Sequence, residues 1–222
     1  MVSQHVEDAA ALRSTRTHLV FAPHVKLLHL GRLDERLAAH LDGVAVAGEF
    51  GAHLADAALE SPGAGAVFVA TVGAIEGGQS ARLDQLFSLV EAVPESQRGL
   101  ISAFGWVSAQ SLKGTIKELL SSRSSLRQRV AIACCTMHRV DPSKALDSAI
   151  EDADVALRAR SLRAAGELAR SDLLPACHRA SKDEDEGCRF CGTWSAVLLG
   201  DRRIALDALK MIAFFPGAFR DR

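Results

Sequence analysis

Tyrosine is absent from this 222-residue chain, and aromatic residues of all kinds make up only 5% of it. Because β-sandwiches and barrels are rich in aromatic and β-branched residues, this shortage argues against an all-β fold. Alanine instead supplies about one residue in six, and alanine has the highest intrinsic helix propensity. The composition therefore predicts an all-α protein whose helices pack closely.

Long apolar runs and a secretory leader are also missing. No run approaches the roughly 18–20 residues that a membrane-spanning helix needs. The segment from Met1 to Asp8 lacks the basic start and apolar core of a signal peptide. The five cysteines are an odd number and too sparse for a secreted disulfide scaffold. We expect a cytoplasmic protein with reduced thiols and no membrane partner.

Motifs for common chemistries are absent as well. The sequence contains no GxxxxGKS/T phosphate loop, no GxSxG nucleophile motif, no HExxH metal motif and no GxGxxG motif after a strand. The formal net charge of -1 gives no general attraction to polyanions. We therefore expect no cofactor, and the charge balance disfavours nucleic acid as a partner.

What the sequence has instead is a repeat with an offset of 31 residues. Leu126 and Arg127 align with Leu157 and Arg158, and Arg158 in turn aligns with Arg189. Each unit has a first helix with apolar residues at helical spacing, then a break, then a second apolar segment. The break carries a residue able to cap the second helix: Ser80, Ser108, Asp141, Asp172 or Asp201.

These units predict about five helical hairpins within residues 61–222, at 63–92, 96–121, 124–151, 155–181 and 186–213. A hairpin of this size cannot bury its apolar face alone, so neighbours must stack. The predicted fold is one continuous α/α superhelix, a solenoid of helical hairpins. Residues 1–60 are expected to form an N-terminal helical cap, with one helix over 6–20 and a helix pair over 33–60 that breaks at Gly43.

The stretch from Val155 through Leu-Leu-Pro-Ala at 173–176 to Asp183-Glu-Asp resembles a HEAT repeat. It is most similar to the short subtype of phycobilisome lyases, with arginine in the first helix and acidic residues at the repeat boundary. The runs LDERLAAHLDGVAVAGEFG at 33–51 and GLISAFGW at 99–106 resemble a bacterial family of uncharacterised HEAT-type proteins. That family is associated with type VI secretion gene neighbourhoods, and its longer members carry several more repeats. The resemblance implies a solenoid that binds proteins, and it brings no catalytic residue.

Two surfaces are candidates for partner binding. The second helices are expected to line a concave, mildly basic face suited to an acidic peptide, although a merely solvated face fits as well. Its predicted exposed residues are Arg82, Gln85, Lys113, Lys117, Lys144, His178, Arg179 and Arg202. The other surface is the C-terminal end, where Phe214, Phe215 and Phe219 either fold back as a cap or bind a partner or a second copy. On this interpretation the chain is a short form of a longer array.

Cys177, His178, Cys188 and Cys191 form the one constellation with metal-ligand residue types. Adjacent Cys-His ligands converge poorly on one ion, and Cys188 replaces Leu157 in the repeat, so buried structural thiols are the simpler interpretation. A redox pair is a third option, because a thiol near a helix N-terminus can have a lowered pKa.

Arginines also recur with the repeat, as Arg98, Arg129 and Arg160, and as Arg127, Arg158 and Arg189. They form either a phosphate-binding stripe or ion pairs with acidic clusters at the hairpin boundaries.

The resulting functional hypothesis is a non-enzymatic scaffold or adaptor that binds another protein or peptide, linked to bacterial secretion if the resemblance holds. The first alternative is a metal- or thiol-dependent, lyase-like enzyme that uses the cluster of Cys177, His178, Cys188 and Cys191. The second is a nucleic-acid-binding HEAT solenoid.

Overall fold

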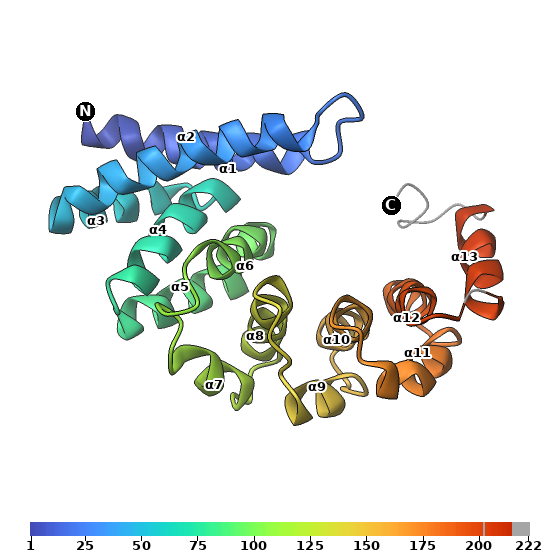
Figure 1. Ribbon diagram of the computed structural model, residues 1–222. Coiled ribbons are helices and arrows are strands. Elements are labelled where there is room, and N and C mark those ends of the chain that lie inside the picture. Colours follow the sequence, from blue (N-terminus) through green and yellow to red (C-terminus); the bar gives the residue numbers. More distant parts are fainter. Residues whose placement is uncertain (202, 215–222) are drawn as a thin grey trace. The chain divides into compact units, whose positions relative to one another are not determined.

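The computed structural model describes the backbone of residues 1–201 and 203–214. In this part of the chain it contains thirteen α-helices, three short 3-10 helices and no β-strand (Figure 1). The all-α prediction is therefore confirmed. None of these helices combines the length and the apolarity that crossing a bilayer requires. The helices divide into two compact units, unit 1 from Met1 to Leu112 and unit 2 from Lys113 onward.

Unit 1 contains six α-helices. They are α1 (Val2–Leu19), α2 (Leu27–Val46), α3 (Gly48–Ala57), α4 (Ala64–Glu76), α5 (Ser80–Ala92) and α6 (Gln97–Trp106). The apolar helix α4 packs between α1 and α6 and is buried along most of its length. The Phe68 ring meets the Trp106 ring edge to face, with ring centroids 5.8 Å apart.

The predicted break at Gly43 is wrong, because α2 runs through Gly43 to Val46. A Cβ atom at position 43 would lie 2.9 Å from the His5 ring. The glycine therefore allows α1 and α2 to approach closely and does not end the helix. The break falls at Gly48, whose φ of 56° is a left-handed conformation that glycine adopts without strain.

Two further glycines allow close helix crossings in unit 1. A Cβ atom at Gly65 of α4 would lie 2.2 Å from the Ala10 carbonyl oxygen of α1. A Cβ atom at Gly99 of α6 would lie 2.0 Å from the Ala64 carbonyl oxygen of α4. Real Cβ atoms do not approach oxygen this closely, so both crossings need glycine.

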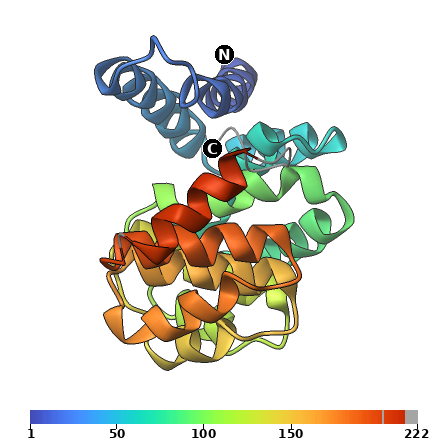
Figure 2. The ribbon, with the colours of Figure 1, turned by 90° about the vertical axis from the view of Figure 1, so that its right-hand side faces the viewer.

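Unit 2 has two layers of helices. The longer first helices of the hairpins form one layer, and the shorter second helices form the other (Figure 1). The first helices are α8 (Ser125–Met137), α10 (Val155–Glu167) and α12 (Glu186–Leu198), and α10 packs against both α8 and α12. The second helices α7 (Thr115–Leu120), α9 (Lys144–Ala149) and α11 (Leu174–Ala180) lie on the other side of that layer (Figures 1 and 2). Helix α13 (Ile204–Phe214) packs against α12.

The repeat in unit 2 is visible in its helix caps. The side chains of Ser124, Asp154 and Asp185 each accept the backbone N–H three residues on, at the start of α8, α10 and α12. At the other end, the N–H groups of Val140, Arg170 and Asp201 bond to carbonyls five residues earlier, a Schellman-type ending. Each first helix with its two caps therefore has the same length.

The period itself is less regular than the sequence alignment assumed. The caps Ser124 and Asp154 are 30 residues apart, whereas Asp154 and Asp185 are 31 apart. The connection through α9 is one residue shorter than the connection through α11. The alignment of Arg158 with Arg189 is confirmed, but the structural counterpart of Arg158 in α8 is Gln128, not Arg127.

Four of the five expected hairpin ranges each contain one helix pair: α4 with α5, α8 with α9, α10 with α11, and α12 with α13. The range 96–121 contains α6 and α7, which belong to different units. Unit 1 also includes the expected cap together with the first hairpin. The superhelical arrangement of the whole chain stays a prediction.

Candidate functional site

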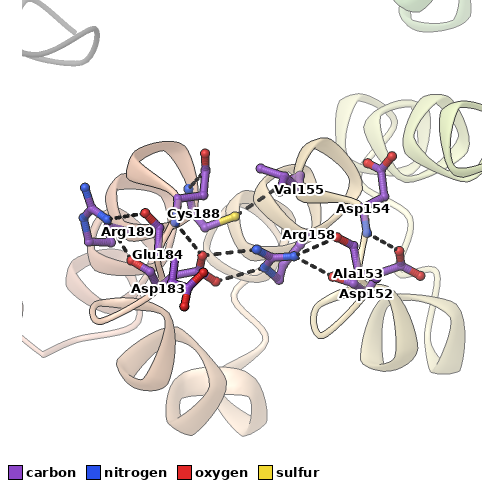
Figure 3. Close-up of polar contacts among 10 residues, drawn as sticks. Asp152, Ala153, Asp154, Val155, Arg158, Asp183, Glu184, Cys188 and Arg189 are labelled. Carbon is purple, nitrogen blue, oxygen red and sulfur yellow. Dashed lines mark hydrogen bonds and ion pairs between the residues drawn. The ribbon is translucent and has the colours of Figure 1, made fainter.

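The arginine at position 158 joins two repeat boundaries (Figure 3). Its Nε and Nη2 groups donate to the two carboxylate oxygens of Asp183, at 2.9 and 3.1 Å. Its Nη1 group donates to the carbonyls of Asp152 and Ala153, at 2.7 and 3.3 Å. The guanidinium thus ties the connection before α10 to the connection before α12.

In the next repeat, Arg189 makes the equivalent contacts with the carbonyls that precede its own helix. Arg189 Nη1 donates to the carbonyls of Asp183 and Glu184, at 2.8 Å each. In α8 the equivalent Gln128 donates through Nε2 to the Ser122 carbonyl at 2.6 Å. These side chains satisfy carbonyls that precede each first helix, so this ladder is structural in unit 2.

The second predicted arginine ladder is not one set of equivalent residues. Arg98 is exposed, whereas Arg129 and Arg160 are half-buried. Burial lowers the pKa of the Arg129 guanidinium. Arg160 pairs with Glu167 at 2.5 Å and donates to the Thr136 hydroxyl. A phosphate-binding stripe needs cations that face solvent, and Arg158 and Arg160 are instead occupied within unit 2.

The cysteines have the properties of packing residues. None of the five forms a disulfide, and all are buried except the half-buried Cys191. Burial raises the pKa of the Cys177 thiol to about 11 and that of Cys188 to about 12. Cys188 occupies the same helix position as Leu157, and both are fully buried.

The redox option needs a lowered Cys188 pKa, and burial raises that pKa instead. Desolvation is the largest influence on the thiol, and the nearby Arg158 charge only partly opposes it. The Cys188 Sγ atom donates to the Val155 carbonyl at 3.6 Å. Among the described residues, which include Cys177, His178, Cys188 and Cys191, no three His, Cys, Asp or Glu side chains are placed to hold one metal ion.

His178 has a different partner from the one a metal site would need. Its Nε2 atom lies 3.0 Å from the Asp201 carboxylate, at the edge of a cavity of about 240 Å³ between α11 and α13. Cys177 and Thr193 line the same cavity.

The residues predicted for the partner-binding face have different surroundings. Gln85, Lys113, Lys117 and Lys144 are exposed, and so is Arg179, which pairs with Glu151. Arg202 lies outside the described residues. Phe215 and Phe219 also lie outside them, and the described part of Phe214 is its backbone alone.

Arg82, unlike the exposed residues of the predicted face, lines an open groove in unit 1. We call it the unit-1 groove. The groove has a volume of about 400 Å³ and is formed by α2, α3, α4 and the start of α5. Its buried lining residues are Leu41, Val44, Ala55, Val69, Ala70 and Val72. Its exposed edge carries Glu49, Gly73 and Glu76 among others. Sequence reasoning missed this groove apart from Arg82, because its walls come from four different helices and depend on how those helices pack.

Arg82 does not offer a free positive charge to this groove. Its Nη2 atom lies 2.5 Å from the Asp56 carboxylate and donates to the Ala52 carbonyl at 3.3 Å. Glu49 and Glu76, by contrast, have no ion-pair partner within the described parts of the chain. The groove is therefore acidic at its edge, the opposite of the basic face expected around Arg82.

A second exposed feature lies on α12. Phe190, Trp194 and Leu198 follow one another at intervals of four residues, so they share one helix face. The two aromatic rings stack, with centroids 6.1 Å apart and planes inclined by 24°. Trp194 is 41% exposed and Leu198 51% exposed. We call these three residues the α12 stripe.

Comparison of the chain with protein-family models, with curated proteins and with solved structures found no match in any of the three.

Proposed function

We propose that this chain is a non-enzymatic, HEAT-type helical-repeat scaffold that binds another protein through the α12 stripe. The main observation behind this proposal is that equivalent positions are polar in one repeat and apolar in the next. In α10 the positions of Phe190, Trp194 and Leu198 are occupied by Ala159, Arg163 and Glu167. Arg163 and Glu167 form an ion pair at 2.7 Å on that helix.

A polar, paired face is the expected surface for a helix in water, and α10 has one. Helix α12 instead exposes Trp194 and Leu198, and the half-buried Phe190 ring stacks on Trp194. Tryptophan is enriched among the residues that dominate protein–protein binding energy, whereas an isolated exposed leucine is ordinary. The α12 stripe is therefore suited to bind a partner whose own apolar surface covers Trp194.

The resemblance to HEAT-type proteins of secretion gene neighbourhoods makes a secretion component the first partner to seek. Helix α13, which packs against α12, also exposes two apolar side chains, Leu206 and Met211. A second copy of the chain is the competing occupant, and light scattering across a concentration series separates the two.

The test compares Trp194→Glu with Val140→Glu in the full chain. Val140 is 53% exposed and also lies in unit 2, so it controls for adding a carboxylate to an exposed apolar position. Proteins retained by the wild-type chain from cells that express it are identified, purified and titrated individually. We expect Trp194→Glu to weaken binding of the true partner by about thirtyfold or more. A purified partner that binds both variants as tightly as the wild type would contradict the proposal.

The two alternatives have direct tests of their own. Zinc at about one equivalent per purified chain would favour the metal enzyme, for which the described side chains provide no ligand group. Salt-sensitive DNA binding would favour the nucleic-acid solenoid.

A further inference from the structure

The unit-1 groove combines an apolar interior with carboxylates that have no counterion among the described residues. Its interior is made by buried aliphatic side chains such as Leu41, Val44 and Val72. A volume of about 400 Å³ lies within the range of ligand-binding sites, roughly 300–1,000 Å³. It is the edge of this groove that identifies the kind of ligand.

Glu76 is in an environment that disfavours its negative charge. It is the last residue of α4, where the exposed helix carbonyls carry partial negative charge. Partial burial and the neighbouring Asp42 carboxylate both raise its pKa. No cation within the described residues pairs with Glu76, and Glu49 on α3 adds a further carboxylate to the same edge. A ligand cation would relieve this repulsion.

At position 73 the groove has space for a larger side chain, but the chain has a glycine there. It lies inside α4, and glycine there costs about 1 kcal/mol relative to alanine. Unlike Gly65 of the same helix, Gly73 has no atom within 4 Å of the position a Cβ would take, and its φ is not left-handed. Neither close helix crossing nor backbone geometry requires a glycine here. The missing side chain leaves room in the groove.

We propose that the unit-1 groove binds a basic amphipathic helix of a protein partner, with an apolar side chain in the groove and a Lys or Arg beside Glu49 and Glu76. Residues three or four apart share a helix face, so one helical turn can present both groups. Arg82 is already paired with Asp56 and therefore does not repel the incoming cation at full strength. This site lies in unit 1 and is independent of the α12 stripe in unit 2. It goes beyond the proposed function by adding a second contact of stated charge.

The test titrates the full chain into two fluorescein-labelled synthetic peptides and follows fluorescence anisotropy. Both peptides have about 14 residues, with leucines at helical spacing. One carries lysines at the remaining positions, and the other carries glutamates. We expect the lysine peptide to bind and the glutamate peptide to bind at least about tenfold more weakly.

Two groove variants then locate the binding site. The double variant Glu49→Gln with Glu76→Gln removes the carboxylates, and its matched control is Glu35→Gln, an exposed carboxylate on α2 away from the groove. Gly73→Leu fills the groove without changing any charge, and it favours the helix. We expect about tenfold weaker binding for the double variant and loss of binding for Gly73→Leu, with Glu35→Gln unchanged.

The outcomes separate this proposal from the scaffold proposal. Lysine-peptide binding that survives both groove variants overturns the groove proposal, and so does failure of the lysine peptide to bind. If Trp194→Glu alone abolishes binding, the peptide occupies the α12 stripe, which overturns the groove proposal and supports the scaffold. Folding of Gly73→Leu is checked by circular dichroism, and the charge-only double variant decides the question if that variant does not fold.

Discussion

Arg158 and Asp183 form a side-on pair with two parallel hydrogen bonds, although 25 residues separate them. Both side chains are mostly buried, with 19% and 16% of their surface exposed. The same guanidinium also satisfies two backbone carbonyls before α10 (Figure 3). One side chain thus connects consecutive repeats through four hydrogen bonds, which distinguishes it from the exposed ion pairs of unit 2.

The first prediction concerns the stability of this junction. Arg158→Met leaves the Asp183 carboxylate with only the Asp185 N–H as donor and leaves two carbonyls without one, and we expect a loss of about 2–3 kcal/mol in the free energy of unfolding. Arg158→Lys keeps the charge but not the planar fork, so it should recover only part of the loss. Urea denaturation measures the loss, and amide hydrogen exchange in α10 and α12 locates it. The control Arg163→Met, at an exposed pair, should change stability by less than about 0.5 kcal/mol. Equal effects of Arg158→Met and Arg163→Met would contradict this interpretation.

The second prediction follows from the charge of the same pair. The hydrogen bonds from Arg158 hold the pKa of Asp183 below its ordinary value of 3.8. A lowered folded-state pKa contributes stability above the unfolded-state value, and the contribution disappears as pH falls through the folded-state value. The stability difference between the wild type and Asp183→Asn should therefore be full at pH 7 and shrink below about pH 4. Urea midpoints at pH 7, 4 and 3 measure it, and a constant difference across this range would show that Asp183 is not held ionised by Arg158.

Local signals predicted the all-α class but not the positions of the helix caps. Ser80, Ser108, Asp141 and Asp172 were expected to cap second helices, but α5, α7, α9 and α11 have no side-chain cap at their N-termini. The side-chain caps lie instead at the first helices α8, α10 and α12. The all-α class follows from alanine content and spacing. The equivalence of Gln128 with Arg158 was missed because a one-residue difference in the connection through α9 leaves almost no trace in composition.

The candidate sites were harder to predict than the fold class, because they depend on contacts between different helices. Arg82 was chosen as an exposed basic residue, but its partner Asp56 lies on another helix, α3. The groove edge needs Glu49 and Glu76 to come together from α3 and α4, and no spacing rule within one helix predicts that. The α12 stripe does follow from spacing: Phe190, Trp194 and Leu198 are four residues apart. It was overlooked because apolar residues at helical spacing normally face a core.

The third prediction compares two glycines of α4. Gly65→Ala would place a Cβ atom 2.2 Å from the Ala10 carbonyl, so α1 and α4 must move apart. We expect a loss of about 1–3 kcal/mol, as for other overpacked sites. Gly73→Ala meets no atom within 4 Å and should gain up to about 1 kcal/mol from helix propensity. Thermal and urea denaturation of the two variants measures the opposite signs. A stabilising Gly65→Ala would mean that α1 and α4 do not cross this closely.

The fourth prediction concerns the reactivity of the thiols. Iodoacetamide at pH 8 reacts with the thiolate, and burial raises the pKa values of Cys134 and Cys188 to about 12 and that of Cys177 to about 11. We expect mass spectrometry of the folded chain to find the half-buried Cys191 alkylated first, and the buried cysteines labelled only in urea. Cys191→Ser serves as the control, because it should remove the early adduct and leave the other sites slow.

The same thiols should make the fold sensitive to alkali. A thiol with a raised folded-state pKa contributes stability that is present below its ordinary value of 9.0 and is lost as pH rises toward the folded-state value. Unfolding free energy should therefore fall between about pH 9 and 11, and the fall should be smaller in Cys188→Ala than in the wild type. Rapid alkylation of Cys188 in the folded chain at pH 8 would mean an accessible thiolate at the start of α12. That result would favour a thiol-dependent enzyme over the scaffold, because a nucleophile at a helix N-terminus is the arrangement that such chemistry uses.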